Sequence, residues 1–114
     1  MKTLAVVTGL LLSALFLRAA DISGTWTANV SLDVGNGTAT FMFKQTGETL
    51  SGTYGGTFGD AKVSGTVKGN SAEWSFEAPQ AGKVVYKGAI EGSKITGTCE
   101  YGQLGKGTFT AEKK

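Results

Sequence analysis

The stretch SGTYGGTFG, residues Ser51–Gly59, twice places a glycine, a threonine and an aromatic side chain in succession. Variants of this unit recur along the chain, with a glycine, then a small residue, then a larger apolar one. They stand at Ser23–Trp26 (SGTW), Ser64–Val67 (SGTV), Lys87–Ile90 (KGAI), Thr96–Cys99 (TGTC) and Lys106–Phe109 (KGTF). Glycine and the larger residue are two positions apart, so both lie on the same face of a β-strand. The unit therefore predicts strands in which one face alternates glycine with larger side chains.

The same period of two extends through nearly all of residues 22–112, and no segment there has a convincing helical period. It predicts eight strands: Ile22–Leu32, Thr38–Lys44, Thr49–Tyr54, Ala61–Lys68, Ala72–Glu77, Val84–Ile90, Lys94–Tyr101 and Gly107–Glu112. The connections between them are short, which makes consecutive strands antiparallel neighbours. Eight such strands with one apolar face predict an all-β fold, an antiparallel up-and-down β-barrel closed so that no sheet edge is exposed.

The direction of the two faces follows from their composition. Large aromatic residues share one face, while threonine, serine, lysine and glutamate share the other. A membrane barrel has apolar residues outside and polar ones inside, so this arrangement predicts a soluble barrel with the aromatics in its interior. Inward glycines let the strands coil sharply and leave room for the bulky residues beside them. A glycine-rich phosphate loop is not expected, because no helix follows the repeat.

The first twenty residues are predicted to be a signal peptide rather than part of the fold. Met1-Lys2 is a short basic start, Leu4–Leu17 is apolar, and Arg18-Ala19-Ala20 precedes the polar Asp21. The alternative is a short uncleaved anchor, although the apolar run is short for a membrane span, which needs roughly 18 residues. Cleavage after Ala20 would leave residues 21–114 as a single β-barrel domain. The predicted location is therefore outside the cytoplasm, in a periplasm or the extracellular medium, with no membrane span after cleavage.

Charge and composition exclude several classes of function. The net charge of +2 disappears with Lys2 and Arg18, which leaves nine lysines and nine acids in the predicted mature chain. No basic patch indicates nucleic-acid binding. The chain has no histidine and only one cysteine, Cys99, which removes histidine-based catalytic and metal sites and any internal disulfide. We therefore predict no metal, no cofactor and no catalytic residue.

Two short stretches carry a resemblance to known proteins. Ile22-Ser23-Gly24-Thr25-Trp26 resembles the first strand of calycin barrels, the group that contains lipocalins and avidins, and Gly47–Tyr54 (GETLSGTY) resembles the second hairpin of avidins. The chain also resembles small exported bacterial proteins that share this pattern. Membership would imply a cup that is closed at one end and binds a small molecule at the other. Trp26 matches the tryptophan that plugs the closed end.

An avidin-like barrel would imply biotin as the ligand. Tyr54 matches the tyrosine that reaches the ureido group of biotin. The chain departs from the family at Ala28 and Gly56, where avidins have asparagine and serine, and the late tryptophans that enclose biotin have no clear equivalent. Without those donors the buried ureido group would lose hydrogen bonds worth about 1–3 kcal/mol each. We therefore do not expect biotin to bind.

Chain direction assigns the two ends of the barrel. The tight turns Thr46–Glu48, Gly69-Asn70 and Glu91–Ser93 share one end with both termini, which we expect to be closed. The connections Asp33–Gly37, Gly55–Asp60, Pro79–Gly82 and Gly102–Gly105 are longer and predict the mouth. The candidate ligand-binding residues near that mouth are Phe41, Tyr54, Phe58, Phe76, Tyr86 and Tyr101. Apolar walls with a few hydroxyl groups are typical of a site for a small hydrophobic or aromatic ligand.

Two classes of function remain open. The first is a carrier that binds a small apolar ligand in the barrel mouth. The second is a structural or protein-interaction module whose barrel is filled by its own side chains, because an eight-stranded barrel is just wide enough for them. An enzyme is not expected, since Glu73, Glu77, Glu100 and Glu112 all alternate outward. Asp33 and Asp60 are the only acids placed to meet at the mouth, and Cys99 is expected to be an inert inward residue.

Overall fold

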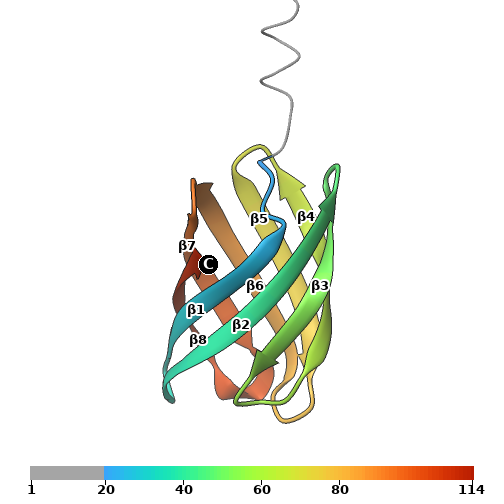
Figure 1. Cartoon of the computed structure of the whole chain (residues 1–114). Coiled ribbons are helices and arrows are strands. Elements are labelled where there is room, and N and C mark those ends of the chain that lie inside the picture. Colours follow the sequence, from blue (N-terminus) through green and yellow to red (C-terminus); the bar gives the residue numbers. More distant parts are fainter. Residues whose placement is uncertain (1–19) are drawn as a thin grey trace, which may run out of the picture.

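The computed structural model describes residues 20–114. The predicted signal peptide therefore lies outside the described residues except for Ala20. The chain forms eight antiparallel strands in one closed barrel, each paired with its neighbours in sequence and the last with the first (Figure 1). They are β1 (Gly24–Leu32), β2 (Gly35–Thr46), β3 (Thr49–Gly56), β4 (Ala61–Lys68), β5 (Ser71–Ala78), β6 (Gly82–Glu91), β7 (Lys94–Tyr101) and β8 (Lys106–Lys113). The predicted all-β, eight-stranded antiparallel barrel is confirmed.

The interior is the face that the alternation predicted. In β5, for example, Ala72, Trp74 and Phe76 are buried, while Glu73 and Glu77 are exposed. The buried set takes apolar residues from every strand and forms one hydrophobic cluster inside the barrel. Among the described residues, no charged side chain is buried. A local pattern with a period of two is therefore enough to place each side chain inside or outside.

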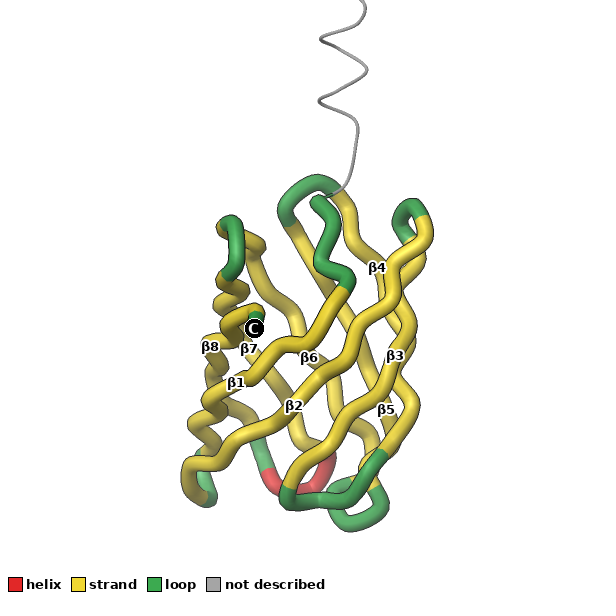
Figure 2. Tube along the Cα trace, viewed as in Figure 1, coloured by secondary structure: helices red, strands yellow, loops and turns green. Residues whose placement is uncertain are grey.

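The closed end has three two-residue turns, at the top of Figure 2, which each begin with a glycine at positive φ: Gly47 (61°), Gly69 (57°) and Gly92 (61°). A glycine in this position is typical of tight hairpin turns whose twist matches that of the strands. The residues before β1 cross this end of the barrel. Ile22 is fully buried there, and the Trp26 indole N–H donates a hydrogen bond to its carbonyl oxygen at 2.9 Å. The buried Trp26 side chain therefore lies near this end of the barrel.

Gln45 fastens this N-terminal segment, which the sequence did not indicate. Its side-chain oxygen accepts a hydrogen bond from the Ile22 backbone at 2.9 Å, and its amide donates to the carbonyl oxygen of Ala20 at 2.7 Å. The backbone N–H of Ala20 also donates to Gly69 at 2.9 Å. The predicted domain boundary after Ala20 thus falls inside a hydrogen-bonded segment.

Two glycines of the repeat, Gly52 and Gly97, differ in one respect from the prediction, whereas a β-carbon on Gly88 would lie 2.9 Å from the Cζ atom of the Phe109 ring. A β-carbon on Gly52 would lie 1.9 Å from the Met42 carbonyl oxygen of the neighbouring strand. A β-carbon on Gly97 would lie equally close, at 1.9 Å, to that of Lys87. These glycines let backbones approach each other where the strands coil, as expected, but the space is taken by backbone rather than by an aromatic ring. Gly24, predicted to face inward, is exposed.

The mouth end is less open than predicted. The connection predicted at Asp33–Gly37 is a two-residue turn, Asp33–Val34, because Gly35–Gly37 pair with β1 as part of β2. The connection between β7 and β8 contains a short 3₁₀ helix, η1 (Gly102–Leu104). No helix in the described part of the chain is long and apolar enough to cross a membrane.

Candidate functional site

The mouth is formed by the β1–β2 turn and the connections 57–60, 79–81 and 102–105, at the lower end of Figure 2. Backbone hydrogen bonds tie these connections to one another or to neighbouring strands. The Gln80 N–H donates to the Phe58 carbonyl oxygen at 3.3 Å, and the Asp33 N–H donates to that of Lys106 at 3.3 Å. The Tyr101 N–H donates to Gly105 at 2.8 Å, which closes the turn around η1.

A small pocket lies at this mouth, between the β1–β2 hairpin and the connection that carries Phe58. Its volume is about 130 Å³. Its walls are mainly apolar side chains, to which two tyrosines and polar residues of β2 add hydroxyl and amide groups. The apolar and aromatic side chains are Val30, Leu32, Val34, Tyr54, Phe58 and Tyr101. An enclosed apolar cavity of about 150 Å³ holds benzene, so this pocket matches one ring or a short aliphatic group.

Three of the predicted residues line the pocket, and three lie deeper. Tyr54, Phe58 and Tyr101 border it, and the Phe58 ring lies 5.5 Å from the Tyr101 ring, centroid to centroid. Phe41, Phe76 and Tyr86 are in the hydrophobic core, with exposed fractions of 0–4%. The alternation that selected the five strand residues specifies the face of a strand, not the depth along the barrel axis, and Phe58 was selected for its place in a connection at the rim.

The deep aromatic rings contact one another in a continuous network. Phe41 is at its centre, with ring centroids 5.1–5.9 Å from those of Phe43, Tyr54, Trp74, Phe76 and Tyr86. Trp74 stacks on Tyr86 at 5.2 Å with an interplanar angle of 14°. These distances are those of packed aromatic pairs. In the described barrel, side chains therefore occupy the region where a deep calycin cup would hold its ligand.

The tyrosines form a polar group at the inner end of the pocket. The Tyr86 and Tyr101 hydroxyls are hydrogen-bonded to each other and buried. Burial raises the pKa of Tyr101 and Tyr86 above their usual range, and the neighbouring Tyr101 adds to the effect on Tyr86. Burial also raises the pKa of Tyr54, while hydrogen bonding with the Phe58 backbone and Tyr101 lowers it in part. At neutral pH all three are protonated, so they can donate and accept hydrogen bonds.

Gly56 determines where the Tyr54 hydroxyl lies. A β-carbon at Gly56 would be 2.6 Å from that hydroxyl oxygen. Avidins have serine at this position. The absence of a side chain here leaves space for the Tyr54 ring to extend toward the mouth.

The other candidate groups contribute no reactive centre at the mouth. Cys99 is buried, and burial raises the pKa of its thiol to about 11, which keeps it protonated at neutral pH. Asp60 lies against Gly55, and Asp33 against Gly105, so the two acids are beside different strand pairs. Within residues 20–114, no group of three or more cysteine, aspartate or glutamate side chains could hold a metal ion.

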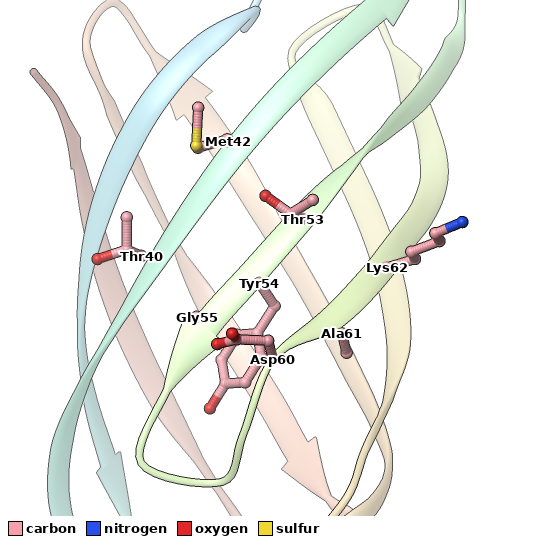
Figure 3. A pocket seen from close by; sticks show the side chains of 8 residues that line it. All are labelled: Thr40, Met42, Thr53, Tyr54, Gly55, Asp60, Ala61 and Lys62. Carbon is pink, nitrogen blue, oxygen red and sulfur yellow. The ribbon is translucent and has the colours of Figure 1, made fainter.

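A second, shallow hollow of about 680 Å³ lies on the outer wall over β2, β3 and β4 (Figure 3). Outward side chains of these strands border it, together with the backbone of Gly55 and the inward residues Tyr54 and Ala61. Its lining residues are Thr40, Met42, Thr53, Tyr54, Gly55, Asp60, Ala61 and Lys62. The sequence reasoning missed it because each of these strands reads separately as an ordinary polar face. The exposure of Met42, an apolar residue at an outward position, was the available signal.

Comparison of the chain with protein-family models and with curated protein sequences gave no match. The functional argument therefore rests on the residues of the barrel itself.

Proposed function

We propose that the protein is an exported, calycin-type binding protein that takes one small aromatic or apolar group in the pocket at the barrel mouth. The pocket at the predicted mouth supports this, because apolar walls surround a few hydroxyl groups. Export is proposed from the order of basic, apolar and small residues in the first twenty positions. The ligand is a single ring or a short chain, because packed aromatics fill the deeper interior.

The chemistry of the pocket limits the ligand further. Tyr54 and Tyr101 offer neutral phenol hydroxyls, and no charged side chain lines the pocket. A charged ligand would lose its hydration without gaining an ion pair, which is costly. The proposed ligand is therefore neutral, with at most one or two hydrogen-bonding groups, as in phenol.

A matched pair of variants tests this assignment. Val34 (66% exposed) lines the mouth pocket, and Met42 (57% exposed) lies on the outer wall. The purified protein is titrated with phenol, indole, decanoic acid and biotin, and tryptophan fluorescence and melting temperature are recorded. We expect saturable binding of phenol, weakened at least tenfold by Val34→Lys, a loss of about 1.4 kcal/mol, and unchanged by Met42→Lys. Binding that both variants leave intact would place the ligand elsewhere.

The packed interior favours a second candidate, a structural or protein-interaction module without a ligand. In that case the aromatic network serves only stability, and the outer wall or the connections contact the partner. No response to any of the four compounds, in a protein with a high melting temperature, would favour this candidate.

A further inference from the structure

The barrel wall is not uniformly paired. The ladder between β4 and β5 runs from Lys68–Ser71 to Ser64–Ser75 and stops, although each strand continues for three more residues toward the mouth. Residues 61–63 of β4 still pair with β3, and residues 76–78 of β5 still pair with β6. Within the described barrel, this leaves a seam between residues 61–63 and residues 76–78. The barrel stays closed by the rest of this ladder, and at the seam the facing sides of β4 and β5 are unpaired.

A proline lies at the mouth end of the seam. If the ladder continued, Lys62 would face Glu77 and Asp60 would face Pro79. Proline has no N–H to donate at that point. Its ring packs against the opposite connection, since a β-carbon on Gly59 would lie 2.9 Å from the Pro79 Cγ. By the alternation of an antiparallel ladder, the backbone N–H and C=O of Lys62 and Glu77 point into the seam.

An aromatic stack lies directly behind the seam. The rings of Tyr54 (β3) and Phe76 (β5) are parallel within 21°, with centroids 4.2 Å apart. They meet across β4, where the inward residue beside Tyr54 is the small Ala61. The outer hollow of Figure 3 borders the same place, because Tyr54 and Ala61 both line it. Apart from this stack, the two edges are joined at the mouth by the Gln80–Phe58 hydrogen bond and by the contact of Pro79 with Gly59.

From this arrangement we infer that the seam parts to admit a planar aromatic ligand between the Tyr54 and Phe76 rings. The Tyr54–Phe76 stack is then replaced by two stacks, one between the ligand and each ring. The backbone groups of Lys62 and Glu77 bind polar atoms on the edge of the ligand. This inference rests on the proposed function and extends its ligand class, since a two-ring planar molecule exceeds the mouth pocket alone. The mouth pocket then holds the ring that projects toward Phe58.

A disulfide across the seam tests the inference, with a matched disulfide in the paired part of the same ladder as control. The pair Lys62→Cys and Glu77→Cys closes the seam, and the pair Thr66→Cys and Glu73→Cys joins residues that are already paired. Both are made with Cys99→Ala, which removes the native thiol. The probe is the neutral dye N-phenyl-1-naphthylamine, which carries a planar two-ring naphthalene for the seam and a separate phenyl ring for the mouth pocket. We expect the oxidised seam disulfide to weaken or slow its binding at least tenfold, reduction to restore it, and the control disulfide to change nothing.

The outcomes distinguish ligand insertion at the seam from binding in the mouth pocket. Tight dye binding to the oxidised seam variant, lost in Val34→Lys, would leave the mouth site standing and overturn ligand insertion at the seam. Absence of dye, phenol and indole binding in the unmodified protein would overturn both proposals. Hydrogen exchange in the unmodified protein gives an independent test. We expect the amides of Lys62 and Glu77 to exchange at least tenfold faster than those of Ser64 and Ser75, and equal protection would refute the seam.

Discussion

Truncation of Phe41 is the most direct test of whether the barrel interior is filled. Phe41 is completely buried, and its ring contacts five other aromatic rings. Replacing a buried phenylalanine with alanine costs about 3–5 kcal/mol in transfer free energy and residual cavity. Each packed aromatic pair adds about 0.5–1.5 kcal/mol beyond the buried area, which places Phe41→Ala at the upper end, at about 4–5 kcal/mol. A domain of this size has a total stability of only about 5–15 kcal/mol.

Equilibrium unfolding in urea, followed by tryptophan fluorescence, measures this loss. Phe41→Leu, which leaves a smaller cavity, keeps the series measurable if the alanine variant is largely unfolded. Met42→Ala is the control, because the neighbouring Met42 points outward and its loss should change stability by less than about 0.5 kcal/mol. Benzene should restore part of the stability of Phe41→Ala, since it fills the space left by the ring.

A decrease in unfolding free energy of less than about 1 kcal/mol for Phe41→Ala would refute a filled interior, provided that the slope of the unfolding free energy against urea concentration is unchanged. Such a small loss requires a side chain that already borders empty space, and the barrel would then be a cup with a deep ligand cavity. A large loss supports the packed interior and confines any ligand to the mouth and the seam.

Three further predictions concern the mouth, the closed end and pH. Gly56→Ala should destabilise the protein by about 1–3 kcal/mol, because its β-carbon meets the Tyr54 hydroxyl, and adding Tyr54→Phe should recover part of this in a urea double-mutant cycle. Gln45→Ala should cost about 1–3 kcal/mol in urea unfolding and speed hydrogen exchange at Ile22, because it removes the hydrogen bonds that fasten the N-terminal segment. Tyr86 and Tyr101 keep their protons in the folded barrel, whereas unfolded tyrosines lose them above about pH 10. Their contribution is therefore complete well below pH 10 and falls by about 3 kcal/mol in total between pH 9 and pH 11, which urea midpoints over that range would measure.

Sequence reasoning was most successful for residues whose position depends on alternation alone. Trp74 and Phe76 are inside and Glu73 and Glu77 outside, as expected from a period of two. It was wrong about Asp33–Gly37, because glycine and asparagine are typical of turns, yet here three of these residues continue the pairing of β2 with β1. Turn composition gives the chance of a turn, while the register of the partner strand decides where pairing ends.

The candidate site was predictable only in outline. Five inward aromatic residues and the rim residue Phe58 were identified, but their separation into a mouth group and a core group depends on strand stagger, which no single strand encodes. The fastening role of Gln45 joins residues that are 23 and 25 positions apart in sequence, and the Tyr54–Phe76 stack crosses an intervening strand. Such contacts appear only when several strands are placed together.

The amino-acid sequence by itself determined the all-β class, the eight strands, their antiparallel order and the side chains that face inward. These properties are local, since each follows from a period of two and from short connections. The tertiary structure decided that aromatic rings fill the interior, that the mouth pocket has a volume of only about 130 Å³, and that β4 and β5 separate near Pro79. These depend on summed side-chain volumes and on the register between strands, which exist only once the barrel has closed.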